Sequence, residues 1–178
     1  LGLTKKVSFR DYIFRLNEIR PQSNIRHFIL IFLLLAAIAL LFIKPVFGII
    51  AIVAMFAVNI SLYFADKAKI EGYFICIKYL CGMVIAAGKI AKLGLKGTPL
   101  EDYSITLAAL SDKFAKIRRG SWLITNSVSG SLVDVLMDYV RMLFHVDLIK
   151  FNNMHAFAME NAESINELYD TLGEIELC

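Results

Sequence analysis

The sequence predicts an all-α protein, in which an N-terminal transmembrane helical hairpin precedes a cytoplasmic helical bundle of long helices. Two apolar runs meet at Lys44-Pro45, and between Phe28 and Ala65 they hold no other charged residue. Further along the chain, apolar residues recur at steps of three and four, the spacing that lines one face of a helix. Gly and Pro fall mainly between these periodic stretches, as expected for helices joined by short links.

Residues 1–27 have the pattern of a basic amphipathic juxtamembrane helix. Ser8 and Asp11 form a start similar to a capping box. The apolar face that follows comprises Phe9, Tyr12, Ile13, Leu16 and Ile19. A basic helix beside a membrane span suits the anionic cytoplasmic leaflet. The same pattern suits a surface helix docked on the protein itself, so both interpretations stay open.

The segment 28–65 is predicted to be the transmembrane hairpin. At about 1.5 Å per residue, Phe28–Ile43 would be about 24 Å long and Val46–Ala65 about 30 Å long, both near bilayer thickness. Pro45 lacks a backbone donor and disfavours helix at the residue before it, so we expect the chain to turn there. Because the first run is slightly short, a buried helical hairpin in a soluble protein is the alternative.

Basic residues lie mostly at one side of the predicted hairpin, whose turn holds only Lys44. The others are Lys5, Lys6, Arg10, Arg15, Arg20 and Arg26 before the hairpin, and Lys67 and Lys69 after it. Since cytoplasmic flanks carry the excess of Lys and Arg, we expect the plasma (cytoplasmic) membrane, with both termini and the helical domain on the cytoplasmic side. In that reducing compartment the three cysteines should be thiols.

Residues 66–97 are predicted to form a connecting helix, and residues 98–178 a helical domain. Thr98, Pro99 and Glu101 supply an N-cap, an N1 proline and an N3 carboxylate. A heptad stripe follows at Leu100, Tyr103, Leu107, Leu110, Phe114 and Ile117. After an irregular link over 121–130, two or three long helices should follow, and the last carries a packing stripe of Ile165, Leu168, Leu172 and Ile175.

Few residues of the sequence suggest a catalytic or ligand-binding role. Lys113, Lys116, Arg118 and Arg119 form a small basic patch that could contact phosphates or a partner, although the same charges complement a helix C-terminus. Gly82–Lys89 resembles a phosphate loop but has five residues between its glycines instead of four. The residues His145, Asp147 and His155 lack metal-ligand spacing and are interpreted as solvated or interhelical polar groups. We therefore expect no catalytic, cofactor-binding or metal-binding residue in this chain.

A longer set of motifs resembles a known family. The matching stretches are Phe114, Arg118-Arg119-Gly120-Ser121, Ser129-Gly130-Ser131, Leu136-Met137-Asp138-Tyr139, Met142-Leu143-Phe144, Asp147-Leu148 and Glu167–Glu176. Together they look like the core, or lever, helices of MutS-like proteins, specifically a membrane-anchored branch with transmembrane segments upstream. The resemblance covers roughly 95–178 and, weakly, the hairpin.

This resemblance implies that the lever helices lead into a P-loop ATPase domain beyond Cys178, which would hold ATP and Mg²⁺. It also implies a homodimer formed through that domain, and nucleic-acid binding for the parent protein only. The chain contains neither the Phe-x-Glu mismatch-reading motif nor a Walker motif. The resemblance therefore assigns no ATP-binding or mismatch-contacting residue here.

The expected function is that of a non-catalytic, membrane-anchored lever segment coupled to its own downstream ATPase domain. Two other classes remain open. One is a stand-alone membrane scaffold, which would bind a basic partner through its acidic C-terminal helix. The other is a small membrane enzyme, for which the sequence offers no polar constellation.

Overall fold

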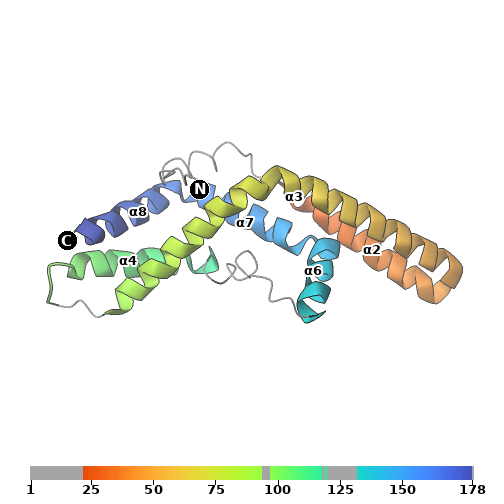
Figure 1. Cartoon of the computed structure of the whole chain (residues 1–178), viewed down its shortest axis with the longest axis horizontal. Coiled ribbons are helices and arrows are strands. Elements are labelled where there is room, and N and C mark those ends of the chain that lie inside the picture. Colours follow the sequence, from red (N-terminus) through yellow and green to blue (C-terminus); the bar gives the residue numbers. More distant parts are fainter. Residues whose placement is uncertain (1–21, 94–96, 118, 120–131, 178) are drawn as a thin grey trace, which may run out of the picture. The chain divides into compact units, whose positions relative to one another are not determined.

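The computed structural model describes residues 22–93, 97–117, 119 and 132–177, and there the chain is helical with no β-strand (Figure 1). Its elements are α2 (Ile25–Ile43), α3 (Pro45–Ile90), the 3₁₀ turn η1 (Ala91–Leu93), α4 (Glu101–Lys113), α6 (Leu132–Phe144), α7 (Val146–Glu160) and α8 (Ala162–Leu177). The all-α class is confirmed. The predicted helix before residue 22, the link 121–130 and the side chain of Arg118 lie outside the described residues.

The chain divides into two compact units. The first, called here the hairpin unit, comprises Pro21–Gly72 and Asn126–Asn153. The second, called the bundle unit, comprises the described residues of Tyr73–Thr125 and Met154–Cys178. Each unit has its own set of buried side chains and is described separately.

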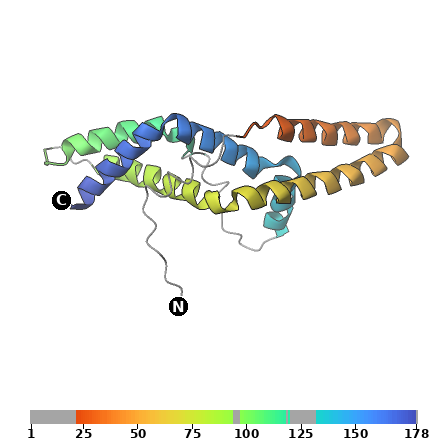
Figure 2. The ribbon, with the colours of Figure 1, turned by 90° about the horizontal axis from the view of Figure 1, so that it is seen from above.

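In the hairpin unit, α2 and the first part of α3 run side by side in opposite directions (Figures 1 and 2). Lys44 is the only residue between the two helices, and its φ of −139° and ψ of 87° interrupt the helical path before Pro45. Its backbone N–H still donates to the carbonyl of Leu40 at 2.8 Å, and its own carbonyl accepts from the N–H of Gly48 at 2.9 Å. The predicted turn at Lys44-Pro45 is confirmed.

The two helices of the hairpin lie very close together just after this turn. A Cβ placed on Gly48 would lie 2.3 Å from the Cα of Leu41, a distance that no side chain can occupy. Further from the turn, α2 buries His27, Leu30, Leu34 and Ala37, which recur at steps of three and four. Tight packing along one narrow stripe therefore holds the hairpin together.

Helix α3 does not end where the apolar run ends. It continues through 46 residues to Ile90, so the second helix of the hairpin and most of the predicted connecting helix are one element. No proline follows Pro45 within this range, and the isolated Gly72 and Gly82 are tolerated inside the helix. The predicted connecting helix is thus helical as far as Ile90, and it continues the second run without a break.

In the bundle unit, α4 packs against α8 and η1. The predicted heptad residues Leu107, Leu110, Phe114 and Ile117 are buried. The start of α4 is later than the capping pattern predicts, because Thr98-Pro99-Leu100 form a turn first. The two capping side chains still act there: Thr98 Oγ1 accepts from the N–H of Leu100 at 3.3 Å, and Glu101 Oε2 accepts from the N–H of Gly97 at 2.8 Å.

Three helices, α6, α7 and α8, follow the link, as the absence of proline predicts. The residues of the predicted packing stripe in α8 are buried to different extents. Ile165 and Leu168 are fully buried, whereas Leu172 and Ile175 are half-buried. Phe114 and Phe157 pack edge to face, with ring centroids 5.9 Å apart, and extend the same core.

Candidate functional site at the base of the hairpin

The outer surface of the hairpin is apolar over most of its length. Both helices are long and apolar enough to cross a membrane, and only 22% of the α2 window and 17% of the α3 window are buried within the protein. Large exposed side chains on this surface include Phe28, Phe32, Phe42, Ile43, Val46, Phe47, Ile49, Ile50 and Val53. A contiguous apolar surface of this extent marks a region covered by a partner or a membrane.

Polar residues gather where this surface ends. Arg26, near the start of α2, pairs with Asp66 of α3, and Lys69 donates to the other oxygen of Asp66 at 3.3 Å. The carboxylate is almost fully buried, while the Arg26 and Lys69 side chains are 51% and 64% exposed. Because Asp66 sits between two cations, its negative charge is compensated at a site shielded from water.

His27 follows Arg26 directly and meets a second histidine, His145, from a distant part of the sequence. Nδ1 of His27 lies 2.8 Å from Nδ1 of His145, and Nε2 of His145 lies 3.1 Å from the backbone carbonyl of Asn59. A carbonyl only accepts, so Nε2 of His145 carries the hydrogen and Nδ1 of the neutral ring accepts. His27 must therefore donate from its own Nδ1. Both rings are buried.

His145 also has an unusual backbone. Its φ of 51° lies in the left-handed region, and it separates α6 from α7. Its carbonyl accepts from the N–H of Ile149 at 2.9 Å, which starts α7. A non-glycine residue keeps such a conformation only where its surroundings hold it, and the two ring contacts do so here.

Tyr63 and Asp147 form the third part of the site. The Tyr63 hydroxyl donates to Oδ2 of Asp147 at 2.6 Å, and Lys67 donates to the Tyr63 oxygen at 2.9 Å. Asp147 lies in the first turn of α7, where the helix dipole favours a negative charge. We call the residues Arg26, His27, Asn59, Tyr63, Asp66, Lys67, His145 and Asp147 the polar cluster.

The polar cluster joins three elements. It connects α2 and α3 of the hairpin to the start of α7, and Asn24 extends it by hydrogen bonds to Asn152 and Asn153 at 2.9 and 2.7 Å. Most polar groups of the cluster form hydrogen bonds or ion pairs with one another. None of them is arranged as a nucleophile beside a base. Its chemistry is that of a specific interhelical connection.

Burial, followed by the nearby charge of Arg26, lowers the pKa of His145, while the hydrogen bond to Asn59 and the charge of Asp147 oppose this shift. The folded state thus prefers the neutral ring, and the unfolded state binds more protons once the pH falls below about 6.5. The contribution of His145 to the stability of the hairpin unit should therefore be fully present above about pH 6.5 and should decrease as the pH falls below that value.

We therefore expect acidification from about pH 7.5 to about pH 5 to destabilise the hairpin unit. Thermal unfolding followed by circular dichroism in detergent micelles measures the change. His145→Asn, which tolerates the left-handed conformation and does not titrate, should flatten the pH dependence. An equal slope in this variant would show that His145 does not titrate with unfolding.

The bundle unit contains the basic residues that the sequence singled out. Lys113 is exposed, and its Nζ donates a hydrogen bond to Ser164 Oγ of α8 at 2.6 Å. Lys116 and Arg119 are exposed. A phosphate or partner contact for these basic residues stays a prediction.

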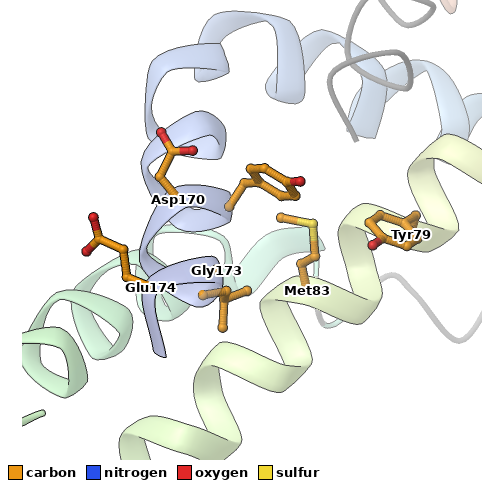
Figure 3. Close-up of a pocket in the computed structure, with 7 residues that line it drawn as sticks. Tyr79, Met83, Asp170, Gly173 and Glu174 are labelled. Atoms are coloured by element: carbon orange, nitrogen blue, oxygen red, sulfur yellow. The ribbon is translucent and has the colours of Figure 1, made fainter. Parts of the chain in front are cut away.

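An open groove of about 530 Å³ lies between α3 and α8 in the same unit. Its lining residues are Tyr79, Met83, Tyr169, Asp170, Leu172, Gly173 and Glu174. Figure 3 shows Tyr79 and Met83 on the α3 side, whereas the carboxylates of Asp170 and Glu174 project from α8 away from them. The groove is therefore apolar and aromatic inside, with its negative charge on the rim.

The remaining motifs are parts of helices. Gly82–Lys89 lies within α3, so its backbone N–H groups serve the helix and cannot cradle a phosphate. Among the described residues, no group of three or more His, Cys, Asp or Glu could hold a metal ion. Cys76 and Cys81 are buried and form no disulfide. His145 and Asp147 prove to be interhelical rather than solvated.

Sequence reasoning did not find the pairing of His27 with His145, which are separated by 118 positions. One signal was present: Asn59, Tyr63 and Asp66 recur at steps of four and three on an otherwise apolar stretch. Polar residues placed like this on a membrane-length helix normally face other protein groups.

No family model, curated protein or solved structure matches this chain.

Proposed function

We propose that this chain is a non-catalytic, membrane-anchored lever segment of a MutS-like protein. In this proposal the α2–α3 hairpin spans the cytoplasmic membrane, and the helices of the bundle unit couple the anchor to a downstream P-loop ATPase domain. The chain itself then performs no chemistry, and ATP and Mg²⁺ belong to that domain.

The exposed apolar surface of the hairpin is the main observation in favour of a membrane anchor. A buried hairpin in a soluble protein would cover these side chains, yet Phe32, Phe42 and Ile43 are 69%, 84% and 75% exposed. Leaving each such side chain in water instead of an apolar medium costs about 1.5–3 kcal/mol. A bilayer removes that cost along the whole length of both helices at once.

The charges at the two ends support the orientation. Arg26, Lys67 and Lys69 lie beside the polar cluster, whereas the turn carries only Lys44. Since cytoplasmic flanks hold the excess of basic residues, the cluster end faces the cytoplasm. The resemblance of residues 95–178 to lever helices implies an ATPase partner in the same compartment.

Lys44 should be reachable only from outside the cell. We expect an impermeant thiol reagent to label Lys44→Cys in intact cells, after Cys76, Cys81 and Cys178 have been replaced by Ala. The matched variant Lys69→Cys, at the other end of the hairpin, should react only after lysis. Labelling of Lys69→Cys in intact cells would reverse the orientation, and extraction of the chain by alkaline carbonate would contradict the anchor.

One observation favours a second candidate, a membrane scaffold that binds a basic partner. The exposed acidic residues of α8 are Glu163, Glu167, Asp170 and Glu174. This face would attract a cationic surface. The encoded sequence beyond Cys178 separates the two candidates, because a Gly-rich loop ending in Gly-Lys-Ser or Gly-Lys-Thr would favour the lever.

A further inference from the structure

Helix α6 belongs to the hairpin unit but does not follow the direction of the hairpin. It contacts α2, and its axis runs across the α2–α3 pair rather than along it (Figures 1 and 2). If the hairpin crosses a bilayer, a helix lying across it is roughly parallel to the membrane plane.

The position of α6 along the hairpin is defined by the residue that ends it. His145 follows Phe144 directly and bonds to His27, the third residue of α2. Arg26 and Lys69, half-exposed or more, lie at the same end. The C-terminal end of α6 therefore lies at the level where the apolar surface of the hairpin gives way to basic side chains.

The surface of α6 is strongly two-sided. Asp134, Asp138 and Arg141 recur at steps of four and three and form its polar side, where Arg141 pairs with Asp138 at 3.2 Å. Around the rest of the helix, the exposed apolar residues are Leu132, Val133, Val135, Leu136, Met137 and Tyr139. Leu136, 64% exposed, lies near the middle of this apolar arc, opposite Asp138.

We propose that α6 is an interfacial helix, which lies in the headgroup region of the cytoplasmic leaflet with its apolar arc against the acyl chains. This inference rests on the proposed function, since it takes the hairpin as the anchor. The apolar arc is then continuous with the apolar surface of α2, and one membrane covers both. Arg26 and Lys69 complement the phosphates of the same leaflet.

The place of the arc favours a membrane over a separate protein partner. Helix α6 contacts α2, and the proposed function places the apolar surface of α2 in the bilayer. A membrane that covers the hairpin therefore reaches α6 as well. Because the hairpin already holds α6 in place, this contact needs no minimum area.

Fluorophores at single cysteines test the proposal on the whole chain reconstituted in vesicles of phosphatidylcholine and phosphatidylserine. With the native cysteines replaced by Ala, a nitrobenzoxadiazole label is attached to Leu136→Cys, to the control Asp138→Cys on the polar side of α6, or to Phe32→Cys on the hairpin. Quenching by a lipid nitroxide near the headgroups, by one deep in the chains, and by aqueous iodide is compared.

We expect the label at position 136 to be blue-shifted, quenched by the shallow nitroxide and shielded from iodide, and the label at 138 to be quenched by iodide. Equal iodide quenching at 136 and 138, with deep quenching at 32, would overturn the interfacial helix and leave the anchor intact. Shielding at 136 without lipid quenching would mean that protein covers the arc. Absence of lipid quenching at 32 would instead overturn the anchor itself.

Discussion

Replacing His145 with Val should destabilise the hairpin unit by about 3 to 5 kcal/mol, one of the largest effects expected for a single substitution in this chain. The variant leaves the buried His27 N–H without its partner, and an orphan group of this kind costs about 1 to 3 kcal/mol. A β-branched residue at a φ of 51° adds backbone strain.

Two further variants separate these causes. His145→Gly removes the ring but accepts the left-handed backbone, so it should lose less stability than His145→Val. Lys150→Val places the same side chain at a half-buried position inside α7 and should cost less than about 1 kcal/mol. Denaturant titration in detergent micelles gives the free energies of unfolding. Equal losses for Val and Gly at position 145 would show that backbone strain contributes nothing.

Replacing Leu168 with Ala should destabilise the bundle unit by about 2 to 5 kcal/mol, because Leu168 is fully buried and the smaller side chain leaves a cavity. A unit of ordinary marginal stability would then open often enough to be cut by protease. Limited proteolysis and thermal unfolding of the reconstituted chain measure this loss.

The neighbours of Leu168 provide graded controls. Leu172→Ala, at a half-buried position beside the groove, should lose clearly less stability than Leu168→Ala. Glu167→Ala, on the exposed side of α8, should change stability by less than about 0.5 kcal/mol. If Leu172→Ala costs as much as Leu168→Ala, the end of the stripe is buried as fully as its middle, and Leu172 is not half-buried.

The heptad stripes show how far periodicity alone can predict a fold. The spacing of Leu107, Leu110 and Phe114 predicts that they share one buried face, and all three are buried. The turn at Lys44-Pro45 can be predicted in the same way, since proline restricts its own backbone and that of the residue before it. Local rules of this kind act within a few residues, so a single sequence contains them in full.

The start of α4 shows where local rules compete. Thr98 and Glu101 both accept backbone hydrogen bonds, yet helix begins only at Glu101. Their donors are the N–H groups of Leu100 and Gly97, each one residue before the N–H group that a capping box would use. A capping pattern thus identifies the region of a helix start more reliably than it identifies the first helical residue.

The sequence by itself determined that this protein is helical, that two apolar helices turn back on each other at Lys44-Pro45, and which faces of α4 and α8 are apolar, because each follows from the chemistry and spacing of nearby residues. Only the tertiary structure decided that His27 meets His145, that Tyr63 meets Asp147, and that α6 leaves its apolar side exposed. These features depend on which distant helices pack together, and in the sequence a polar residue looks the same whether its partner is water or a buried side chain.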